Sequence, residues 1–157
     1  MSRTASPSAR PATRPRWTVS EGETPMPLVT SQGFAPDDAP DWRRADDPGA
    51  AVLLEPGEDA RALAAHLGAI ALIGVRMTAF ADGRAFSVAR RLRAMGYRGR
   101  LRLVGSLVAD QWPLARAVGF DEAAVPEALA DRQPAEDWRR AAALRATPPF
   151  AARRGAA

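Results

Sequence analysis

The chain has 157 residues, which is enough for one domain with a sizeable core, and it contains no cysteine. Disulfides, thiolate catalysis and cysteine-ligated iron–sulfur or zinc sites are therefore excluded within this chain. All 22 basic residues are arginines, set against 18 acidic residues, so the formal net charge is +4. Residues 1–25 carry half of this charge. The remainder is near neutral, so we do not expect nucleic acid as a partner.

The two ends of the chain differ in composition from its middle. Residues 1–25 are rich in Ser, Thr, Pro and Arg without apolar periodicity, so we expect a disordered, basic extension. One hypothesis is that translation starts at Met26 and that this extension is not part of the native protein. We expect a single α/β domain over residues 26–145 and a loose C-terminal tail over residues 146–157.

No segment approaches the roughly 20 apolar residues of a membrane helix, and no apolar h-region follows the N-terminus. We therefore expect neither a membrane partner nor a secretory signal. The absence of cysteine is compatible with a reducing compartment, and we expect a cytoplasmic protein.

The first expected elements are short. Leu28–Val29 predicts a brief strand, and Gly33 predicts a turn. We expect Trp42 to pack over the edge of the domain; the alternative is an exposed contact to a partner. Residues 51–55 read AVLLE, a continuous apolar run typical of a buried parallel strand, which Pro56 ends.

A helix and a second strand follow. Acidic residues at 58 and 59 suit a helix N-terminus, and apolar residues continue to Leu67 at helical spacing, so we expect a helix that Gly68 closes. The run AIALIGV at 69–75 predicts a second buried strand. His66, the single histidine, falls in the last turn of that helix, where we expect a structural role.

The next segment, residues 80–93, reads FADGRAFSVARRLR and predicts a helix that Gly96 stops. RLRLVG at 100–105 alternates arginine with apolar residues, which predicts a third strand with one less buried face. A helix should begin with Asp110 as its N-cap and Pro113 in its first turn, because proline is tolerated only there.

Two elements remain near the C-terminus. AAV at 123–125 predicts a short fourth strand, and AEDWRRAAALR at 135–145 predicts a terminal helix. The alternation of strands and helices indicates a small, mostly parallel sheet of about four strands with right-handed crossovers. An open doubly wound sheet and a partial barrel both fit this pattern.

In either arrangement, functional residues gather where strands end and helices begin. Asp82, Gly83 and Arg84 follow the second strand, and Ser87 comes one turn later. The N-terminal amides, the arginine fork and the hydroxyl could hold a sulfur or phosphorus oxyanion. In the alternative, Asp82 only caps the helix and Arg84 only pairs with an acid such as Asp110.

The equivalent position after the third strand carries Ser106, Asp110 and Gln111. Adjacent parallel strands would bring both clusters to one edge and form a cleft. Asp82 and Asp110 could then act as an acid/base pair, although helix capping explains both positions.

A basic cluster surrounds the second helix and the third strand. This cluster could be a solvated face or a surface for an acidic protein partner. A nucleic-acid site is the least favoured interpretation, because no aromatic residues are interleaved for base stacking. The candidate partner face consists of Arg90, Arg91 and Arg93. With one histidine and no cysteine, we expect no protein-held metal or iron–sulfur cluster, and the residues identify no other cofactor.

Three phrases of the chain resemble the bacterial domain-of-unknown-function family 934 over about residues 26–145. They are FADGRAFSVARRLR, YRGRLRLVG and DQWPLARAVGFD. Members of that family are described as oxidoreductases, and their genes commonly lie beside those for sulfite reductase and adenylyl-sulfate reductase. The family's motif maps onto Phe80, Asp82, Gly83, Arg84, Phe86, Ser87, Asp110 and Gln111, whereas Trp112-Pro113 departs from it.

The resemblance implies an accessory protein of assimilatory sulfite and sulfate reduction. Such a protein would dock on sulfite reductase or its electron donor through the arginine-rich face or the Asp82–Arg84 edge, with a small oxyanion bound at that edge. Two alternatives stay open: an oxidoreductase that uses a borrowed flavin or nicotinamide cofactor, and a structural scaffold without a ligand.

Overall fold

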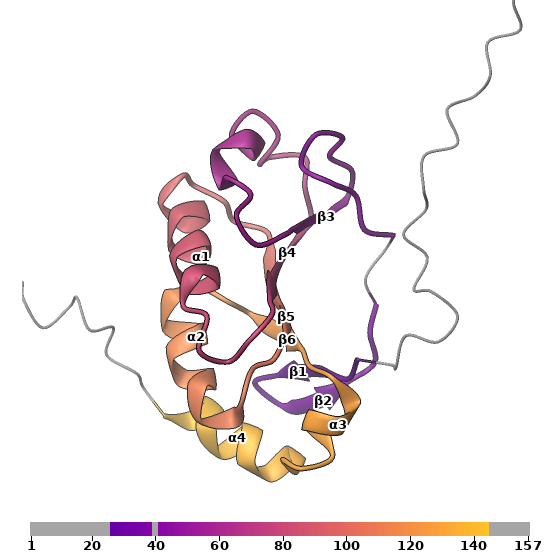
Figure 1. Ribbon diagram of the computed structural model, residues 1–157, viewed down its shortest axis with the longest axis vertical. Coiled ribbons are helices and arrows are strands. Elements are labelled where there is room, and N and C mark those ends of the chain that lie inside the picture. The colour runs from indigo at the N-terminus through magenta and orange to yellow at the C-terminus, as the bar shows by residue number, and fades with distance from the viewer. Residues whose placement is uncertain (1–25, 39–40, 145–157) are drawn as a thin grey trace, which may run out of the picture.

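The computed structural model describes residues 26–38 and 41–144, which form a mixed α/β structure around one six-stranded sheet (Figure 1). The strand order is β2-β1-β6-β5-β4-β3. Four neighbouring strands are parallel, namely β3 (Ala51–Leu54), β4 (Leu72–Met77), β5 (Arg100–Gly105) and β6 (Glu122–Ala124). The expected α/β class and mostly parallel sheet are confirmed, but the sheet has six strands and not four.

The two additional pairings come from an N-terminal hairpin. Strands β1 (Leu28–Thr30) and β2 (Gly33–Ala35) pair antiparallel, and β1 adds antiparallel to β6. Gly33 begins β2 with φ +107°, a backbone conformation that favours glycine. The sequence pattern indicated only the first strand and the turn, because three residues of β2 are too few to show an alternation.

The parallel strands lie side by side in chain order, so every crossover steps across the sheet in the same direction. Right-handed crossovers of this kind leave their connecting segments on one face. Helices α1 (Arg84–Ala94) and α2 (Trp112–Val118) accordingly lie on the same side of the sheet, as Figure 1 shows. The sheet is therefore wound in one direction, as in a partial barrel, although it stays open. A doubly wound sheet would carry helices on both faces.

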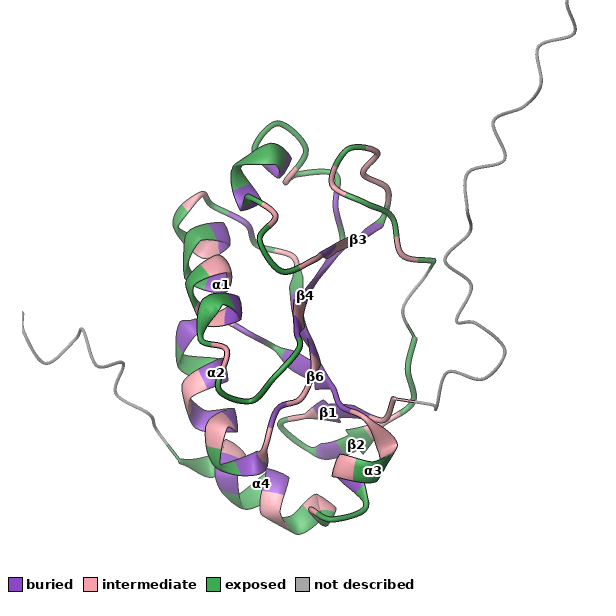
Figure 2. Cartoon of the chain, viewed as in Figure 1, coloured by how far each residue is buried: buried purple, intermediate pink, exposed green. Residues whose placement is uncertain are grey.

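The hydrophobic core lies between the sheet and these helices. The inward faces of α1 and α2 are buried, as Figure 2 shows, and α4 (Ala135–Ala143) packs beside α2. Trp112 and Trp138 are fully buried and meet edge to face with ring centroids 6.4 Å apart. A short helix, α3 (Glu127–Ala130), joins β6 to this layer.

The prediction of a helix over residues 58–67 is wrong. Only a 3-10 turn forms, η1 (Ala60–Leu63), with the Asp59 carboxylate accepting from the backbone N–H of Arg61, and turns follow it. Ala60 and Leu63 are its buried residues, whereas Ala64 is exposed. A helix of ten residues with so small an apolar face gains too little from packing to offset its formation.

The expected N-cap at Asp110 is also wrong. Residues Ala109–Gln111 form a 3-10 turn, η2, with Val108 as its N-cap, and α2 begins at Trp112 with Pro113 in its first turn. The side chain of Gln111 accepts from the N–H of Val108, and that of Gln133 accepts from the N–H of Ala109. These two amides satisfy N–H groups at the start of η2.

The second face of the sheet carries no long helix. It is covered by residues 36–38 and 41–43, called the covering segment below, which reach the edge strand β3 through a parallel bridge between Arg43 and Val52. The face of β5 that its pattern predicted to be less buried is exposed at Arg100, but Arg102 on the same face is fully buried. Trp42 lies on this face, with its ring 5.8 Å from the guanidinium carbon of Arg102, and not at the edge of the domain.

Within residues 26–38 and 41–144, no helix combines the length and the apolar character that crossing a bilayer requires. The expectations for residues 1–25 and 146–157 concern parts of the chain outside the described residues.

Candidate functional site

The loops that follow β4 and β5 meet at the carboxyl ends of the parallel strands, a region called the rim below. The side-chain amide of Gln111 donates to the carbonyl oxygen of Phe80 at 2.6 Å. One step deeper, the N–H of Ser106 donates to the carbonyl oxygen of Met77 at 3.2 Å. The structure thus brings the segment around Asp82 and the segment around Gln111 to one edge of the molecule.

Asp82 and Arg84 bind each other at this rim. The guanidinium donates from Nε to Oδ1 and from Nη2 to Oδ2, both at 2.8 Å, in a bidentate ion pair. The N-cap of α1 is Gly83 and not Asp82 as expected, but Asp82 Oδ1, one residue earlier, accepts from the backbone N–H of Arg84 at 3.1 Å and so satisfies a free N–H of the first turn. These contacts hold the pKa of Asp82 below 3.8, chiefly through the side-chain hydrogen bonds from Arg84.

The geometry of this pair favours one of the two interpretations of the site. An oxyanion would have to displace the Asp82 carboxylate from the fork of Arg84, so the geometry favours a cap and an ion pair over anion binding. The partner of Arg84 is Asp82 and not Asp110. A carboxylate whose pKa is lowered and whose oxygens both accept hydrogen bonds is also poorly suited to acid/base work near neutral pH.

The remaining predicted site residues differ in exposure. Ser87 is exposed on α1, Asp110 is exposed on η2, and Ser106 is half-buried. Gly83 has φ −71° and no atom within 4 Å of the place where a Cβ would stand. Its backbone therefore has no need of glycine.

The rim glycine that the fold requires is Gly105, at the end of β5. Its φ is +137°, and a Cβ there would overlap the carbonyl oxygen of Met77 on β4. Glycine at the end of a strand is a sequence sign of such a close approach.

Phe80 belongs to the family motif but was not among the candidate site residues, and its exposure was not expected from the sequence. Its residue surface is 63% exposed, the largest fraction among the large apolar residues that the structure leaves exposed. By contrast, Phe86 of the same motif packs edge to face on Phe120, with centroids 6.3 Å apart. The sequence feature that indicated this exposure is the position of Phe80, which lies after the last residue of β4 and before α1.

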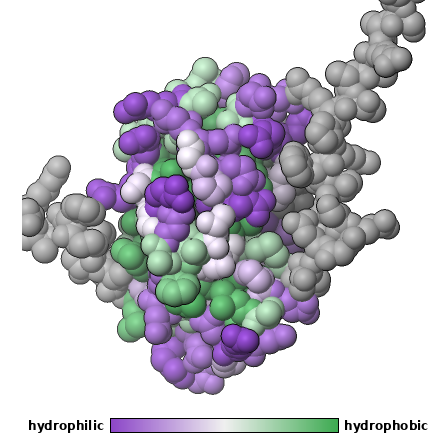
Figure 3. All heavy atoms as spheres, in the orientation of Figure 1, coloured by the Kyte–Doolittle hydropathy of each residue, from purple (hydrophilic) through white to green (hydrophobic). Residues whose placement is uncertain are grey.

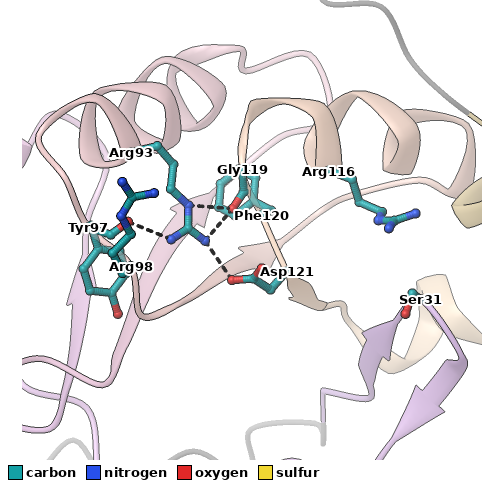
Figure 4. A pocket seen from close by; sticks show the side chains of 8 residues that line it. All are labelled: Ser31, Arg93, Tyr97, Arg98, Arg116, Gly119, Phe120 and Asp121. Carbon is teal, nitrogen blue, oxygen red and sulfur yellow. Dashed lines mark hydrogen bonds and ion pairs between the residues drawn. The ribbon is translucent and has the colours of Figure 1, made fainter.

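Of the three arginines predicted as a partner face, Arg93 is bound within the molecule. Arg93 makes five hydrogen bonds: Nε and Nη2 donate to the Gly119 carbonyl, Nη1 donates to the carbonyls of Tyr97 and Gly99, and Nη2 also donates to Asp121 (Figure 4). A guanidinium has five N–H donors, so Arg93 is saturated inside the molecule. Its function is to join the end of α1 to the turn that follows α2.

The two neighbours of Arg93 in the predicted face are exposed. Arg91 contacts the carboxylate of Asp59 at 3.5 Å, and Arg90 lies beside it in sequence on α1. An ion pair between side chains that are both half exposed contributes little.

A wide hollow of about 570 Å³ opens at the opposite, amino end of the parallel strands. Figure 4 shows Arg98 and Arg116 on its two flanks, pointing away from each other, with the saturated Arg93 between them. Arg116 already donates to the carbonyl oxygen of Ala142. The hollow therefore lacks the converging donors that a small anion needs.

A second hollow, of about 450 Å³, is lined by His66 together with Asp46, Glu58 and Asp59. His66 is exposed, in the turns that follow η1 and not in a helix. Across the described ranges, no three His, Asp or Glu side chains are grouped so that they could hold a metal ion.

Sequence comparison gives the relationship of the chain. A family model described as "Bacterial protein of unknown function (DUF934)" matches residues 51–146, which is more than half of the chain. The chain belongs to the DUF934 family. In this DUF934 protein the matched region holds both rim loops, whereas the hairpin β1–β2 and the covering segment precede it. No curated protein matches the chain in sequence.

Proposed function

We propose that this DUF934 protein is an accessory protein of assimilatory sulfite reduction that docks on sulfite reductase or its electron donor through the rim. The observation that carries the proposal is the exposed ring of Phe80 on a loop whose backbone Gln111 holds at 2.6 Å. The resemblance described above, in which family genes adjoin those for sulfite reductase, supports the choice of partner.

Phe80 has the properties of an interface anchor. Aromatic residues are enriched at the centres of protein interfaces, where a ring fills a pocket of the partner. A loop that is already held in place loses little conformational freedom on binding, which improves affinity. The hydrogen bond from Gln111 fixes the loop at the backbone of Phe80, and the hydrogen bond from the N–H of Arg84 to Asp82 fixes it two residues later.

The charges around Phe80 suit an interface with an apolar centre and surrounding polar contacts. Asp82 and Arg84 neutralise each other, and the side chain of Arg84 remains 69% exposed beside the aromatic residue. Because Arg93 is saturated, the rim suits docking better than the arginine-rich face does. A small oxyanion fits the rim less well, since Asp82 already occupies the fork of Arg84.

The test is co-purification of the tagged full chain from its bacterial host under sulfate-limited growth, with mass spectrometry of the partners. We expect sulfite reductase or its electron donor to co-purify. Phe80→Ala should reduce the recovered partner by at least about tenfold, because truncating a buried anchor costs that much or more. The matched control is Phe34→Ala on β2, whose residue surface is 40% exposed away from the rim, and it should retain the partner.

Two results would overturn the proposal. One is full recovery of the partner with a folded Phe80→Ala variant. The other is a purified protein that is yellow, or that releases a flavin or nicotinamide on heating, without any sulfite-reduction partner; that result would favour an oxidoreductase.

A further inference from the structure

The second face of the sheet is lined by charged residues where a covered sheet usually carries apolar ones. Arg100, Arg102 and Glu122 alternate along β5 and β6 with residues that face the helices. Arg102 is fully buried and Glu122 is 6% exposed. Figure 2 shows no helix over this side of the central strands, so the burial comes from the covering segment.

Asp37 and Asp38 of the covering segment bind these arginines. Arg102 donates from Nη1 to Asp37 at 2.6 Å and from Nη2 to Asp38 at 3.2 Å. Arg100 donates to Asp38 at 2.8 Å. Glu122 of the sheet accepts from Nε of Arg102 and from Nη2 of Arg100, both at 2.9 Å, so the sheet itself neutralises only one of its two arginines.

Trp42 fills a slot that the sheet leaves open. Gly74 on β4 has no side chain there: a Cβ would lie 2.8 Å from Cη2 of Trp42 and 2.9 Å from the side chain of Leu53. The indole also lies over the guanidinium of Arg102, in a cation–π contact at 5.8 Å. The face thus recognises an acidic pair followed by an aromatic residue.

The covering segment is held mainly by these side chains. Its one bridge to the sheet is at Arg43, whose N–H donates to Ala51 and whose carbonyl accepts from Leu53. The carboxylates that bind the arginines are themselves 47% and 61% exposed. This is how a bound peptide is held, with a short stretch of backbone pairing and a few side chains in specific places.

The charged residues on the sheet face also lower the free-energy cost of detaching the covering segment. Burying an ion pair carries a desolvation penalty that an apolar face of equal volume avoids, so buried pairs are weak evidence for stability. An apolar face would be costly to expose to water, whereas Arg100 and Arg102 regain hydration on opening and keep Glu122 as a partner. The family model covers the face but not the covering segment, since its match begins at residue 51.

We propose that this sheet face is a binding surface for an acidic segment of a partner protein, one that carries an aspartate pair and an aromatic residue four to five positions later. Asp37, Asp38 and Trp42 of the chain occupy it in cis and compete with that partner. The inference is independent of docking at the rim, because the two surfaces share no residue.

The direct test uses a fluorescent peptide with the sequence of residues 36–43, PDDAPDWR, and measures its anisotropy with the full chain. A segment tethered in cis acts at millimolar effective concentration, so wild type should bind the peptide weakly. The triple variant Asp37→Asn, Asp38→Asn, Trp42→Ala should bind it at least about tenfold more tightly. The control peptide PNNAPDAR should not bind.

Two further variants locate the binding. Adding Arg102→Met or Gly74→Ala to the triple variant should abolish binding, because the first removes the fork and the second fills the slot. Equal binding to wild type and triple variant, or no binding to a triple variant that retains its circular dichroism, would overturn the proposal. If the triple variant does not fold, saturating peptide on wild type should speed hydrogen exchange at residues 36–44, and unchanged exchange would overturn it.

Discussion

The same guanidinium group has three different environments in Arg93, Arg102 and Arg84. All five donors of Arg93 bind acceptors within the molecule, Arg102 is buried among carboxylates, and Arg84 pairs with Asp82, which precedes its helix. Composition assigns the same charge to each of them. Which one can meet a partner depends on the acceptors around it, and these come from residues up to 65 positions away in the chain.

Tyr97 offers a clean test at the residue scale, because it is the single tyrosine of the chain. Its hydroxyl donates to the carbonyl of Arg100 at 3.0 Å, and burial raises its pKa to about 12 from 10.0. Spectrophotometric titration of tyrosinate should therefore show a midpoint near 12 in the folded protein and near 10.0 in denaturant.

The raised pKa also sets the direction of the stability change. A folded pKa above the unfolded one means that the neutral phenol stabilises the fold fully below pH 10.0, and that this contribution is lost as the pH rises toward 12. A midpoint near 10.0 in the folded protein would contradict the burial of Tyr97.

The junction between β4 and β5 is the most constrained feature at the scale of elements. We predict that Gly105→Ala destabilises the fold by more than about 1 kcal/mol in urea unfolding, because alanine is strained at a φ of +137° and its Cβ would overlap Met77. Gly83→Ala is the matched control on the same rim. Its φ of −71° suits alanine, so it should leave stability unchanged or raise it by about 0.4–1 kcal/mol.

The two glycines also separate structure from function. If the rim requires close approach of a partner at Gly83, Gly83→Ala should weaken co-purification without loss of stability. An equal loss of stability in both variants would contradict the assigned backbone conformations.

At the scale of the whole molecule, the two faces of the sheet are covered in different ways. One face packs against α1, α2 and α4 through an apolar core, and the other packs against the covering segment through charges and Trp42. Conditions that weaken ion pairs should therefore act on the second face before they reach the first.

Acid is such a condition. Asp38 has its pKa held below 3.8, chiefly by the side-chain hydrogen bond from Arg100, and Arg102, Glu122 and Asp37 lie around it. A lowered folded pKa means that the contribution of Asp38 to stability is complete above 3.8 and is lost as the pH falls through its folded value. We expect the covering segment to loosen in that range while the helices persist.

The measurement is the fluorescence of Trp42, obtained as the difference between wild type and Trp42→Phe, with far-ultraviolet circular dichroism as the reference for the helices. Asp38→Asn should give the loosened signal already at neutral pH and a flatter acid response. Fluorescence and circular dichroism that change together in both proteins would show that the covering segment does not open separately.

Local pattern alone determined the class of this protein and most of its parallel strands. The apolar runs at 51–55 and 100–105 became β3 and β5, and the FADGRAFSVARRLR phrase became α1, because apolar periodicity and capping act between residues close in sequence. The same pattern failed over 58–67, where the helical spacing was present but the buried surface was too small.

Tertiary structure alone decided the winding of the sheet, the burial of Arg102, the saturation of Arg93 and the exposure of Phe80. Each of these depends on which distant segments meet: the burial of Arg102 needs Asp37 and Trp42, and the placement of Phe80 needs Gln111. Spacing along the chain indicates which face of an element is apolar, but the free energy of a charge or an aromatic ring is set by the neighbours that the fold places around it.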